Sequence, residues 1–474
     1  MHKISIARNL AWIAFIAGVV SASAQDFSVL VNFDRFNGAN PAWVTLAQGT
    51  DGNLYGTTKF GGRNNGGTLF RLTPDGDLKT LYSFCAESDC PNGEQPVSGM
   101  ILASDGNFYG TTATTVFRAS LRDGITTLYR FCTQECPNGN IPNALIQGAD
   151  GMLYGTTNQG GKGNCPNGCG TVFRMNLQGD FTTTYMFADK DGGKPQGPLV
   201  EGPDGNLYGT TQVGGDQTFC PAYGCGTIFR ITPEGKLTTL HQFDKTQGYL
   251  PISGLTLGRD GAYYGVTLSG GNNASGIVFK TTSEGDFTPI YYFGGGPDGG
   301  APETGLGFGR DGKFYGTTTV GGDMSCAPQG CGTIFVVTSE GQLTTLHDVE
   351  PEDGTVPEGV LVQHTNGKFY ATTLHDGLLK CQFGCGTAYS LNVGLVPFVS
   401  LMRATAKAGF REGILGQGFT GATNVFFNGT SAEFSVRSDT FIEATVPVGV
   451  TNGFVTVVTP KGKLQSNRKF KVWH

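Results

Sequence analysis

The chain has 474 residues, of which 76 are glycine, 38% are hydrophobic and 15% are charged. Abundant glycine without a collagen period, together with this share of hydrophobic residues, excludes a collagen-like or disordered chain and indicates an all-β protein with many tight turns. The formal net charge is −6, and because an acidic protein repels phosphate backbones, we do not expect a nucleic-acid partner.

The first 24 residues have the features of a signal peptide. Lys3 and Arg8 form a basic start, residues 10–20 are an apolar run, and Ala22 and Ala24 flank a serine in a small-x-small cleavage site. The run is too short to span a bilayer comfortably, which disfavours an uncleaved membrane anchor. We therefore expect cleavage after Ala24 and a protein that is secreted or located at the cell surface or in the periplasm. We expect no integral membrane segment after cleavage, and we expect the protein to be a monomer.

A repeated motif, Asp-Gly-x-φ-Tyr-Gly-Thr-Thr, organises residues 25–392. Each repeat contains four short segments rich in aromatic and β-branched residues and bounded by Asp-Gly or Glu-Gly turns, a pattern typical of β-hairpins. Four strands in about 50 residues is the size of one β-propeller blade. The seven copies of the motif begin at Asp51, Asp105, Asp150, Asp204, Asp260, Asp311 and Asn366, and each follows a proline by eight to ten residues.

The fourth segment of the repeat predicts how the ring closes. Six copies end at Phe84, Phe131, Phe187, Phe243, Phe293 and Val349, whereas the seventh repeat stops at Leu391 without one. The missing strand stands at the start of the mature chain, at residues 27–33. We therefore expect a seven-bladed β-propeller over residues 25–392, in which the N-terminal strand completes the last blade and leaves no open sheet edge.

The repeats of residues 27–391 resemble those of a bacterial family. The strings Asp-Gly-x-Leu-Tyr-Gly-Thr-Thr and Gly-Thr-x-Phe-Arg are similar to the tandem repeats of choice-of-anchor GloVer-containing proteins. The resemblance implies an exported or surface protein with a variable C-terminal part, and it implies no activity.

The cysteines fall in six close pairs, which predict local disulfide bonds in an exported protein. Zinc is the less favoured alternative, because the spacing is not Cys-x2-Cys and no histidine lies beside the pairs. Alternating strand direction predicts that all six pairs lie on one face of the propeller. The pairs are Cys85/Cys90, Cys132/Cys136, Cys165/Cys169, Cys220/Cys225, Cys326/Cys331 and Cys381/Cys385.

The disulfide-linked loops of that face are the predicted ligand-binding surface, because ordered loops on a regular scaffold lose less entropy on binding. Aromatic side chains there could stack on sugars or anchor a peptide, or could pack onto their own loops. No cofactor is expected; loop aspartates such as Asp189 and Asp323 could bind calcium, but no Asp-x-Asp-x-Asp ladder accompanies them. The candidate ligand-binding residues are Phe60, Arg63, Phe219, Tyr223, Met324 and Phe383.

No catalytic or metal-binding constellation is recognisable in the sequence. The chain lacks the Gly-x-Ser-x-Gly, His-Glu-x-x-His and dinucleotide-binding motifs. His241 and His347 take the place of a tyrosine in sister repeats such as that of Tyr185, so we interpret them as packing residues rather than bases.

Three hypotheses on function stay open. The leading one is an exported, non-catalytic binding or scaffolding protein that contacts a glycan, an envelope polymer or a protein. The second is a polysaccharide- or glycan-active hydrolase or lyase with its site at the channel mouth, and the third is a purely structural surface component. A buried carboxylate pair or a metal at the channel mouth would favour the enzyme, and a shallow aromatic patch would favour the binding protein. A polar, featureless face would favour the structural component.

After Leu391 the repeats stop and a different pattern begins. Residues 416–430 read Gly-x-Gly-Phe-Thr-Gly-Ala-Thr-x-Val-x-Phe-Asn-Gly-Thr, and Val446-Pro447 and a Val-rich segment at 455–458 follow. This order resembles an IPT/TIG domain, which implies an immunoglobulin-like β-sandwich over residues 393–474. Alternating apolar residues suffice for a sandwich core. The segment holds nine basic and four acidic residues.

Overall fold

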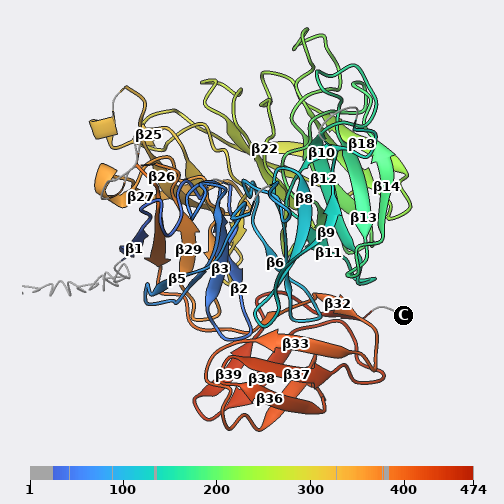
Figure 1. Cartoon of the computed structure of the whole chain (residues 1–474), viewed down its shortest axis with the longest axis vertical. Coiled ribbons are helices and arrows are strands. Elements are labelled where there is room, and N and C mark those ends of the chain that lie inside the picture. The colour runs from blue at the N-terminus through green and yellow to red at the C-terminus, as the bar shows by residue number, and fades with distance from the viewer. Residues whose placement is uncertain are drawn as a thin grey trace, which may run out of the picture.

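The computed structural model describes residues 25–472, except for residues 42, 88, 133–135, 327, 376 and 378–383. Apart from the short 3-10 helices η1 (Met324–Cys326) and η2 (Pro351–Asp353), the regular structure of these residues is all β. The sheets of the repeat region stand side by side, and the C-terminal sheets lie against one end of them (Figure 1).

Each repeat forms a sheet of four main antiparallel strands. The first strands are β2 (Ala47–Gln48), β6 (Ile101–Leu102), β11 (Ile146–Gln147), β15 (Val200–Glu201), β19 (Thr256–Leu257), β23 (Gly307–Phe308) and β28 (Val362–Gln363). The second strands are β3 (Leu54–Thr58), β7 (Phe108–Thr111), β12 (Leu153–Gln159), β16 (Leu207–Thr211), β20 (Tyr263–Thr267), β24 (Phe314–Thr318) and β29 (Phe369–Thr372).

The outer strands follow the predicted third and fourth segments. The third strands are β4 (Thr68–Leu72), β8 (Thr115–Ser120), β13 (Thr171–Met175), β17 (Thr227–Ile231), β21 (Ile277–Thr281), β26 (Gly330–Val337) and β30 (Thr387–Asn392). The fourth strands are β5 (Leu78–Ser83), β9 (Gly124–Arg130), β14 (Phe181–Met186), β18 (Leu237–Gln242), β22 (Phe287–Tyr292) and β27 (Leu343–Asp348). Two short strands extend individual sheets: β10 (Asn140–Pro142) pairs with β12, and β25 (Gly321–Gly322) pairs with β26.

The N-terminal strand lies in the sheet of the last repeat, as expected. β1 (Asp26–Asn32) pairs antiparallel with β30, with Phe27 opposite Leu391 and Asn32 opposite Thr387. The first and last repeats also meet elsewhere, since the Thr372 hydroxyl donates to the Pro41 carbonyl at 3.0 Å.

The tyrosine and glycine of the repeated motif have structural roles. The Tyr154 hydroxyl donates to Asp150 Oδ2 at 2.7 Å, and this fixes the turn to the second strand. A Cβ atom on Gly155 would lie 2.5 Å from Cζ of Phe173, so a larger residue would collide with that ring. The same tyrosine contact and close glycine approach occur in the other repeats with few substitutions.

The two threonines of the motif join strands. The Thr210 hydroxyl donates to the Ser253 carbonyl of the next repeat at 2.6 Å, and the Thr211 and Thr227 hydroxyls lie 2.8 Å apart across one sheet. The fold therefore accounts for each position of the motif, and a functional site must be sought among residues that differ between repeats.

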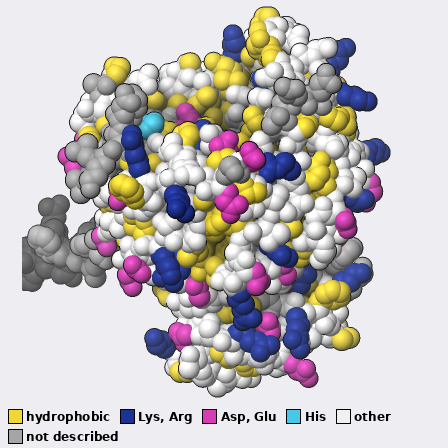
Figure 2. All heavy atoms as spheres, viewed as in Figure 1, with side chains coloured by type: hydrophobic (Ala, Val, Ile, Leu, Met, Phe, Trp, Pro, Cys, Tyr) yellow, Lys and Arg dark blue, Asp and Glu magenta, His cyan; other side chains and the backbone are white. Residues whose placement is uncertain are grey.

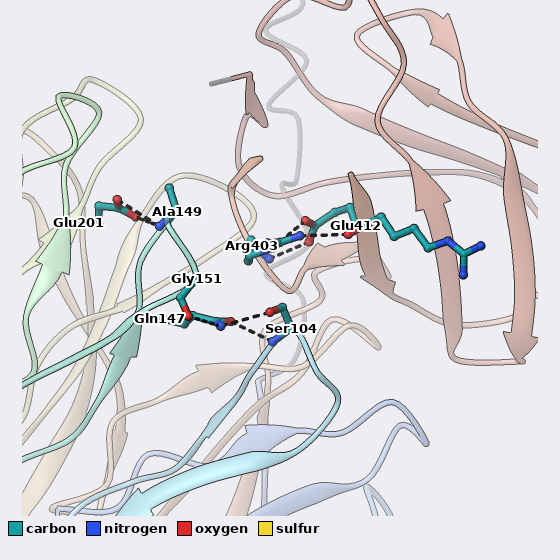
Figure 3. A network of polar contacts seen from close by, with 8 residues as sticks. Ser104, Gln147, Ala149, Gly151, Glu201, Arg403 and Glu412 are labelled. Atoms are coloured by element: carbon teal, nitrogen blue, oxygen red, sulfur yellow. Dashed lines mark hydrogen bonds and ion pairs between the residues drawn. The ribbon is translucent and has the colours of Figure 1, made fainter. Parts of the chain in front are cut away.

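A second type of contact joins neighbouring repeats. In this contact, which we call the clasp, a side chain on a first strand accepts a hydrogen bond from a backbone N–H in the turn of the preceding repeat. Gln147 Oε1 accepts from the Ser104 N–H at 2.8 Å, and Glu201 accepts from the Ala149 N–H at 3.0 Å (Figure 3). Burial raises the pKa of Glu201 to about 7.

The repeat sheets have two different ends. The loop face consists of the described segments after the second strands, at residues 59–67, 112–114, 160–170, 212–226, 268–276, 319–326, 328–329, 373–375, 377 and 384–386. The turn face consists of the seven turns that begin at Asp51, Asp105, Asp150, Asp204, Asp260, Asp311 and Asn366. The C-terminal sheets lie on the turn face, at the end opposite the long loops (Figure 1).

The C-terminal segment forms two four-stranded sheets and a parallel pair that share one core. The core alternates as expected, with Val455 and Val457 buried and Val458 half-buried. The strands are β31 (Ser400–Leu401), β32 (Thr405–Ala406), β33 (Arg411–Leu415), β34 (Asn424–Phe427), β35 (Thr430–Ser431), β36 (Phe434–Ser438), β37 (Phe441–Thr445), β38 (Val455–Thr459), β39 (Gly462–Gln465) and β40 (Lys471–Val472).

Polar contacts hold this segment against the turn face. The Thr440 hydroxyl donates to the Thr50 carbonyl at 2.7 Å, and Arg310 Nη1 donates to the Pro397 carbonyl. Within the segment, Arg403 donates to the buried carboxylate of Glu412 (Figure 3). The C-terminal segment therefore covers part of the turn face, whereas the turn at Asp105 stays exposed.

Candidate functional site

The disulfide prediction is confirmed for five of the six pairs. Sulfur–sulfur bonds join Cys85–Cys90, Cys132–Cys136, Cys165–Cys169, Cys220–Cys225 and Cys326–Cys331. They lie in the loops that precede the first strands or follow the second strands, except that Cys331 already belongs to β26.

The sixth predicted pair, Cys381 with Cys385, is not among these five bonds. Cys385 is 1% exposed and belongs to the core cluster that also holds Phe33 and Tyr370. Its carbonyl accepts a hydrogen bond from the Asn40 N–H at 2.8 Å, which ties the last repeat to the first. The predicted partner Cys381 lies outside the described residues, so the bond between Cys381 and Cys385 stays a prediction.

The predicted ligand-binding residues differ in their exposure. Phe219, Tyr223 and Met324 are 51%, 55% and 56% exposed, and Arg63 is exposed. Phe60 is half-buried and packs against the core of its own repeat, and Phe383 lies outside the described residues. Apolar side chains are visible along the loop end of the molecule (Figure 2). Within the described part of the chain, no hydrogen bond, ion pair or ring contact joins two of these candidates, and their role in ligand binding stays a prediction.

A central cavity of about 470 Å³ brings together residues from all seven repeats. Most lie directly after the repeat proline, where the chain enters the first strand, and others, such as Lys59, belong to the loop face. The cavity therefore lies at the loop-face end of the molecule. Lining residues from successive repeats are Trp43, Val97, Asn143, Gln196, Ser253, Glu303 and Glu358.

Two glutamates of neighbouring repeats face each other in this cavity. Glu303 follows Pro302 and Glu358 follows Pro357, and both residues line the cavity. Two neighbouring carboxyl groups repel each other when both are ionised, which favours the protonated form of one of them. Burial, followed by the facing charge of Glu303, raises the pKa of Glu358 to about 8, and burial also raises the pKa of Glu303.

The carboxyl pair is only partly satisfied by its surroundings. The Thr319 hydroxyl donates to Glu303 Oε1 at 3.4 Å. Glu358 is 5% exposed, yet its Oε2 has no hydrogen-bond partner among the described residues. Ser253 is also 5% exposed, and its hydroxyl likewise lacks a partner within the described part of the chain. Both unpartnered oxygens belong to residues that line the cavity.

An aromatic ring and a cation complete the cavity. Trp43 lines it and is 45% exposed, so part of its indole ring is open to a ligand. Lys59 Nζ lies 5.7 Å from the centroid of the Trp43 ring, and its charge lowers the pKa of Glu358 without cancelling the effect of burial. Lys59, Glu303 and Glu358 are the charged residues among those that line the cavity.

The residue that follows the repeat proline carries a sequence signal for this site that lies outside the recognised motifs. The residue after the repeat proline is Ala42, Val97, Asn143, Gln196 or Ile252 in five repeats and glutamate in the other two. The repeat fold therefore does not need a carboxylate there. A comparison of equivalent positions would have singled out Glu303 and Glu358, but their mutual contact depends on the curvature of the sheets around the cavity.

The two histidines of the fourth strands, His241 and His347, pack against aromatic rings, as predicted from their position in place of a tyrosine. The His241 ring stacks on Phe287 at a centroid distance of 3.8 Å, and burial lowers the pKa of His241 to about 4. His347 stacks on Phe27 at 4.0 Å, and its Nε2 lies 2.7 Å from Asp353 Oδ2.

The described residues include no helix of sufficient length and hydrophobicity to cross a membrane.

Comparison with known proteins identifies the repeats. The family model described as the Gloeobacter/Verrucomicrobia repeat matches three times, at residues 17–132, 92–257 and 221–430. No curated protein matches the chain in sequence.

Solved structures of low sequence identity are similar to the chain. A catalytically inactive virginiamycin B lyase from Staphylococcus aureus, solved with quinupristin, is 14% identical with a TM-score of 0.51, over 78% of this chain and 99% of the lyase. An aldose sugar dehydrogenase from Streptomyces coelicolor is 14% identical with a TM-score of 0.42, over 78% and 98% of the two chains. A gluconolactonase from Xanthomonas campestris is 14% identical with a TM-score of 0.37, over 76% and 88%. Structural neighbours of the chain are propeller-like folds.

Proposed function

The chain belongs to the Gloeobacter/Verrucomicrobia repeat family, and from that premise we propose that it is an exported, non-catalytic protein that binds a glycan in the central cavity. The observation that carries this proposal is the cavity itself, in which a half-exposed indole ring and a buried carboxyl pair lie together at the loop face. The disulfide-linked loops around the cavity would form its rim and contribute further contacts.

The proposed architecture is a seven-bladed β-propeller over residues 25–392 and an IPT/TIG-like, immunoglobulin-like sandwich over residues 393–474. The pairing of β1 with β30 and the contacts between the first and last repeats support a closed ring. The shared core of the two C-terminal sheets supports the sandwich. Five local disulfides support export to an oxidising compartment after removal of residues 1–24 as a signal peptide.

The chemistry of the cavity fits a sugar ring. The flat faces of sugars carry C–H groups that pack on indole rings, and Trp43 offers such a surface next to the cationic Lys59. Sugar hydroxyls donate and accept hydrogen bonds, and the unpartnered oxygens of Ser253 and Glu358 supply matching groups. Because these groups are fixed by buried backbone, they would lose little entropy on binding.

A second candidate function is a polysaccharide- or glycan-active enzyme, and the buried carboxyl pair is the feature that favours it. Glu358 could transfer a proton to or from a substrate near neutral pH, because burial and the charge of Glu303 raise its pKa to about 8. The half-exposed Trp43 ring in the same cavity favours binding. Binding is therefore the better supported function.

The proposal is tested by a glycan and envelope-polymer array on the full secreted chain, followed by titration calorimetry with the strongest ligand. Trp43→Ala should weaken binding at least 10-fold, whereas Phe219→Ala, which truncates an exposed loop aromatic of similar size, should change it by less than threefold. Loss of binding only in the Phe219 variant would contradict the cavity as the site. An array with no bound glycan or polymer would overturn the proposal in favour of a structural role.

The same ligands separate binding from catalysis. Incubation with the wild-type chain should leave each bound glycan intact when the products are analysed by mass spectrometry. Chain cleavage that disappears in the Glu358→Gln variant would instead establish the enzyme.

A further inference from the structure

We propose that Glu303 and Glu358 form a binding site for an oxygen-preferring divalent cation of the calcium class inside the central cavity. The inference rests on the proposed function in so far as the cation would lie in the same ligand-binding cavity and add a contact for the glycan. It assigns the carboxyl pair a specific task in that cavity.

The pair is not required by the repeat fold. Five of the seven repeats place an uncharged residue after the proline, and these repeats form the same four-stranded sheets. Burying one carboxylate costs free energy, and placing a second beside it adds charge repulsion. Two neighbouring repeats nevertheless carry glutamate at this position, which is expected where a ligand compensates for the cost.

Unpartnered oxygens provide independent evidence for a ligand. Buried polar atoms in folded proteins are almost always hydrogen bonded, to protein groups or to a ligand. The Ser253 hydroxyl and Glu358 Oε2 lack a partner among the described residues although both residues are 5% exposed, and both residues line the cavity. They come from the fifth and seventh repeats, on either side of the repeat that carries Glu303, so the unused oxygens flank the pair.

The available donor atoms select the class of cation. The pair offers up to four carboxylate oxygens. The Thr319 hydroxyl lies 3.4 Å from Glu303 Oε1, and Ser253, which also carries a hydroxyl group, lines the same cavity. Hard cations such as Ca²⁺ prefer carboxylate, hydroxyl and carbonyl oxygens. No cysteine or histidine is among the described residues that line the cavity, and those are the ligands that favour zinc or copper.

A dication that binds between the two carboxylates would offset the repulsion between their charges. Lys59 is the other charged residue that lines the cavity, and its positive charge should keep the affinity moderate. A bound cation with open coordination positions would then accept sugar hydroxyls as further ligands.

The site is tested on the full secreted chain after treatment with EDTA, by calorimetric titration with CaCl₂ and separately with MgCl₂ at pH 7. We expect one Ca²⁺ per chain and affinity lowered at least 10-fold in Glu303→Gln and in Glu358→Gln.

Glu201→Gln is the matched control. Glu201 is also a carboxyl group with a raised pKa, but it lies at the turn face, outside the residues that line the cavity, so its amide variant should bind Ca²⁺ like the wild type. Thermal unfolding in EDTA verifies that each variant folds. Absence of binding of both Ca²⁺ and Mg²⁺ to the wild type, or equal binding to the Glu303 and Glu358 variants, would overturn the proposal.

Failure of this inference and failure of glycan binding are distinguishable, because the titration contains no glycan. Ca²⁺ binding without any glycan ligand would support the cation site and overturn the proposed function. Glycan binding that is unchanged between Ca²⁺ and EDTA would overturn the contribution of the cation to glycan binding.

Discussion

Gln48 of the first repeat and Thr365 of the last repeat, 317 residues apart in sequence, are joined by two hydrogen bonds. The Thr365 N–H donates to Gln48 Oε1 at 3.0 Å, and Gln48 Nε2 donates to the Thr365 hydroxyl at 2.8 Å. Gln417 of the C-terminal segment donates to the same hydroxyl at 2.9 Å. Thr365 is therefore the point at which both ends of the repeat region and the C-terminal segment meet.

Substitution of Gln48 by alanine should destabilise the chain by about 1–3 kcal/mol, because the buried partners of its amide lose their hydrogen bonds. The measurement is urea unfolding of the full chain. Gln147→Ala breaks the equivalent clasp between the second and third repeats and should cost a similar amount. A clear loss in the Gln147 variant with none in the Gln48 variant would show that the two ends of the repeat region are not joined in solution.

The carboxyl pair should make stability fall as pH rises. The pKa of Glu358 is about 8 in the fold against an ordinary value of 4.5, so its contribution is complete below pH 4.5 and is lost as the pH approaches 8. Glu358→Gln should flatten this part of the profile and be more stable than the wild type at pH 8 by roughly 2 kcal/mol. The profile is measured by urea unfolding in EDTA at half-unit steps of pH.

Glu201→Gln gives the comparison for that profile. The pKa of Glu201 is about 7, so its variant should flatten only the range below pH 7. A wild-type profile that rises between pH 5 and 8 and is unchanged by Glu358→Gln would contradict the raised pKa of Glu358 in the cavity.

His241 should contribute to loss of stability in acid. Its pKa is about 4 in the fold against an ordinary 6.5, so the neutral ring stabilises the fold above pH 6.5 and this contribution is lost as the pH falls towards 4. His241→Tyr introduces the residue found in sister repeats and should gain about 1–2 kcal/mol over the wild type at pH 5. Acid unfolding followed by circular dichroism measures the shift.

His347→Tyr is the contrasting variant for that experiment. The tyrosine can keep a hydrogen bond to Asp353, as Tyr185 does to Asp191, and because His347 is not buried like His241, the variant should leave the acid response unchanged. An equal acid response of the two variants would mean that burial of His241 is not the cause.

Arg468 should help to hold the C-terminal segment on the turn face. Its guanidinium lies 5.2 Å from the ring centroid of Phe308, and Arg259 lies 5.7 Å from the same ring. Loss of one cation–π contact costs about 0.5–2 kcal/mol, so Arg468→Ala should speed proteolytic cleavage in the connecting residues 393–397. Lys463→Ala, which changes an exposed residue of β39, should leave the rate unchanged. Equal rates in both variants would exclude a role for this contact in docking.

The order of strands and the pairing of the two ends were predictable from the sequence, because both follow from the count of repeated segments. Tyrosine, glycine and threonine recur at positions where each makes the same structural contact in the repeats. Tyr154, for example, donates a hydrogen bond to Asp150. The five observed disulfides were predictable for the same reason, since their cysteines are close in sequence. The bounds of the first strands were less predictable, because these strands are short: β6 covers only Ile101–Leu102.

The sequence by itself determined that this protein is an all-β array of repeats, because hairpin turns and strand pairing depend on residues near one another in the chain. Only the tertiary structure decided that Trp43, Ser253, Glu303 and Glu358 share one cavity. These residues come from four different repeats, and the curvature that brings them together belongs to the whole set of sheets. The pairing of Glu303 with Glu358 leaves no pattern among nearby residues in the sequence. The free energy of the pair depends on burial in the cavity and on a carboxyl group from another repeat.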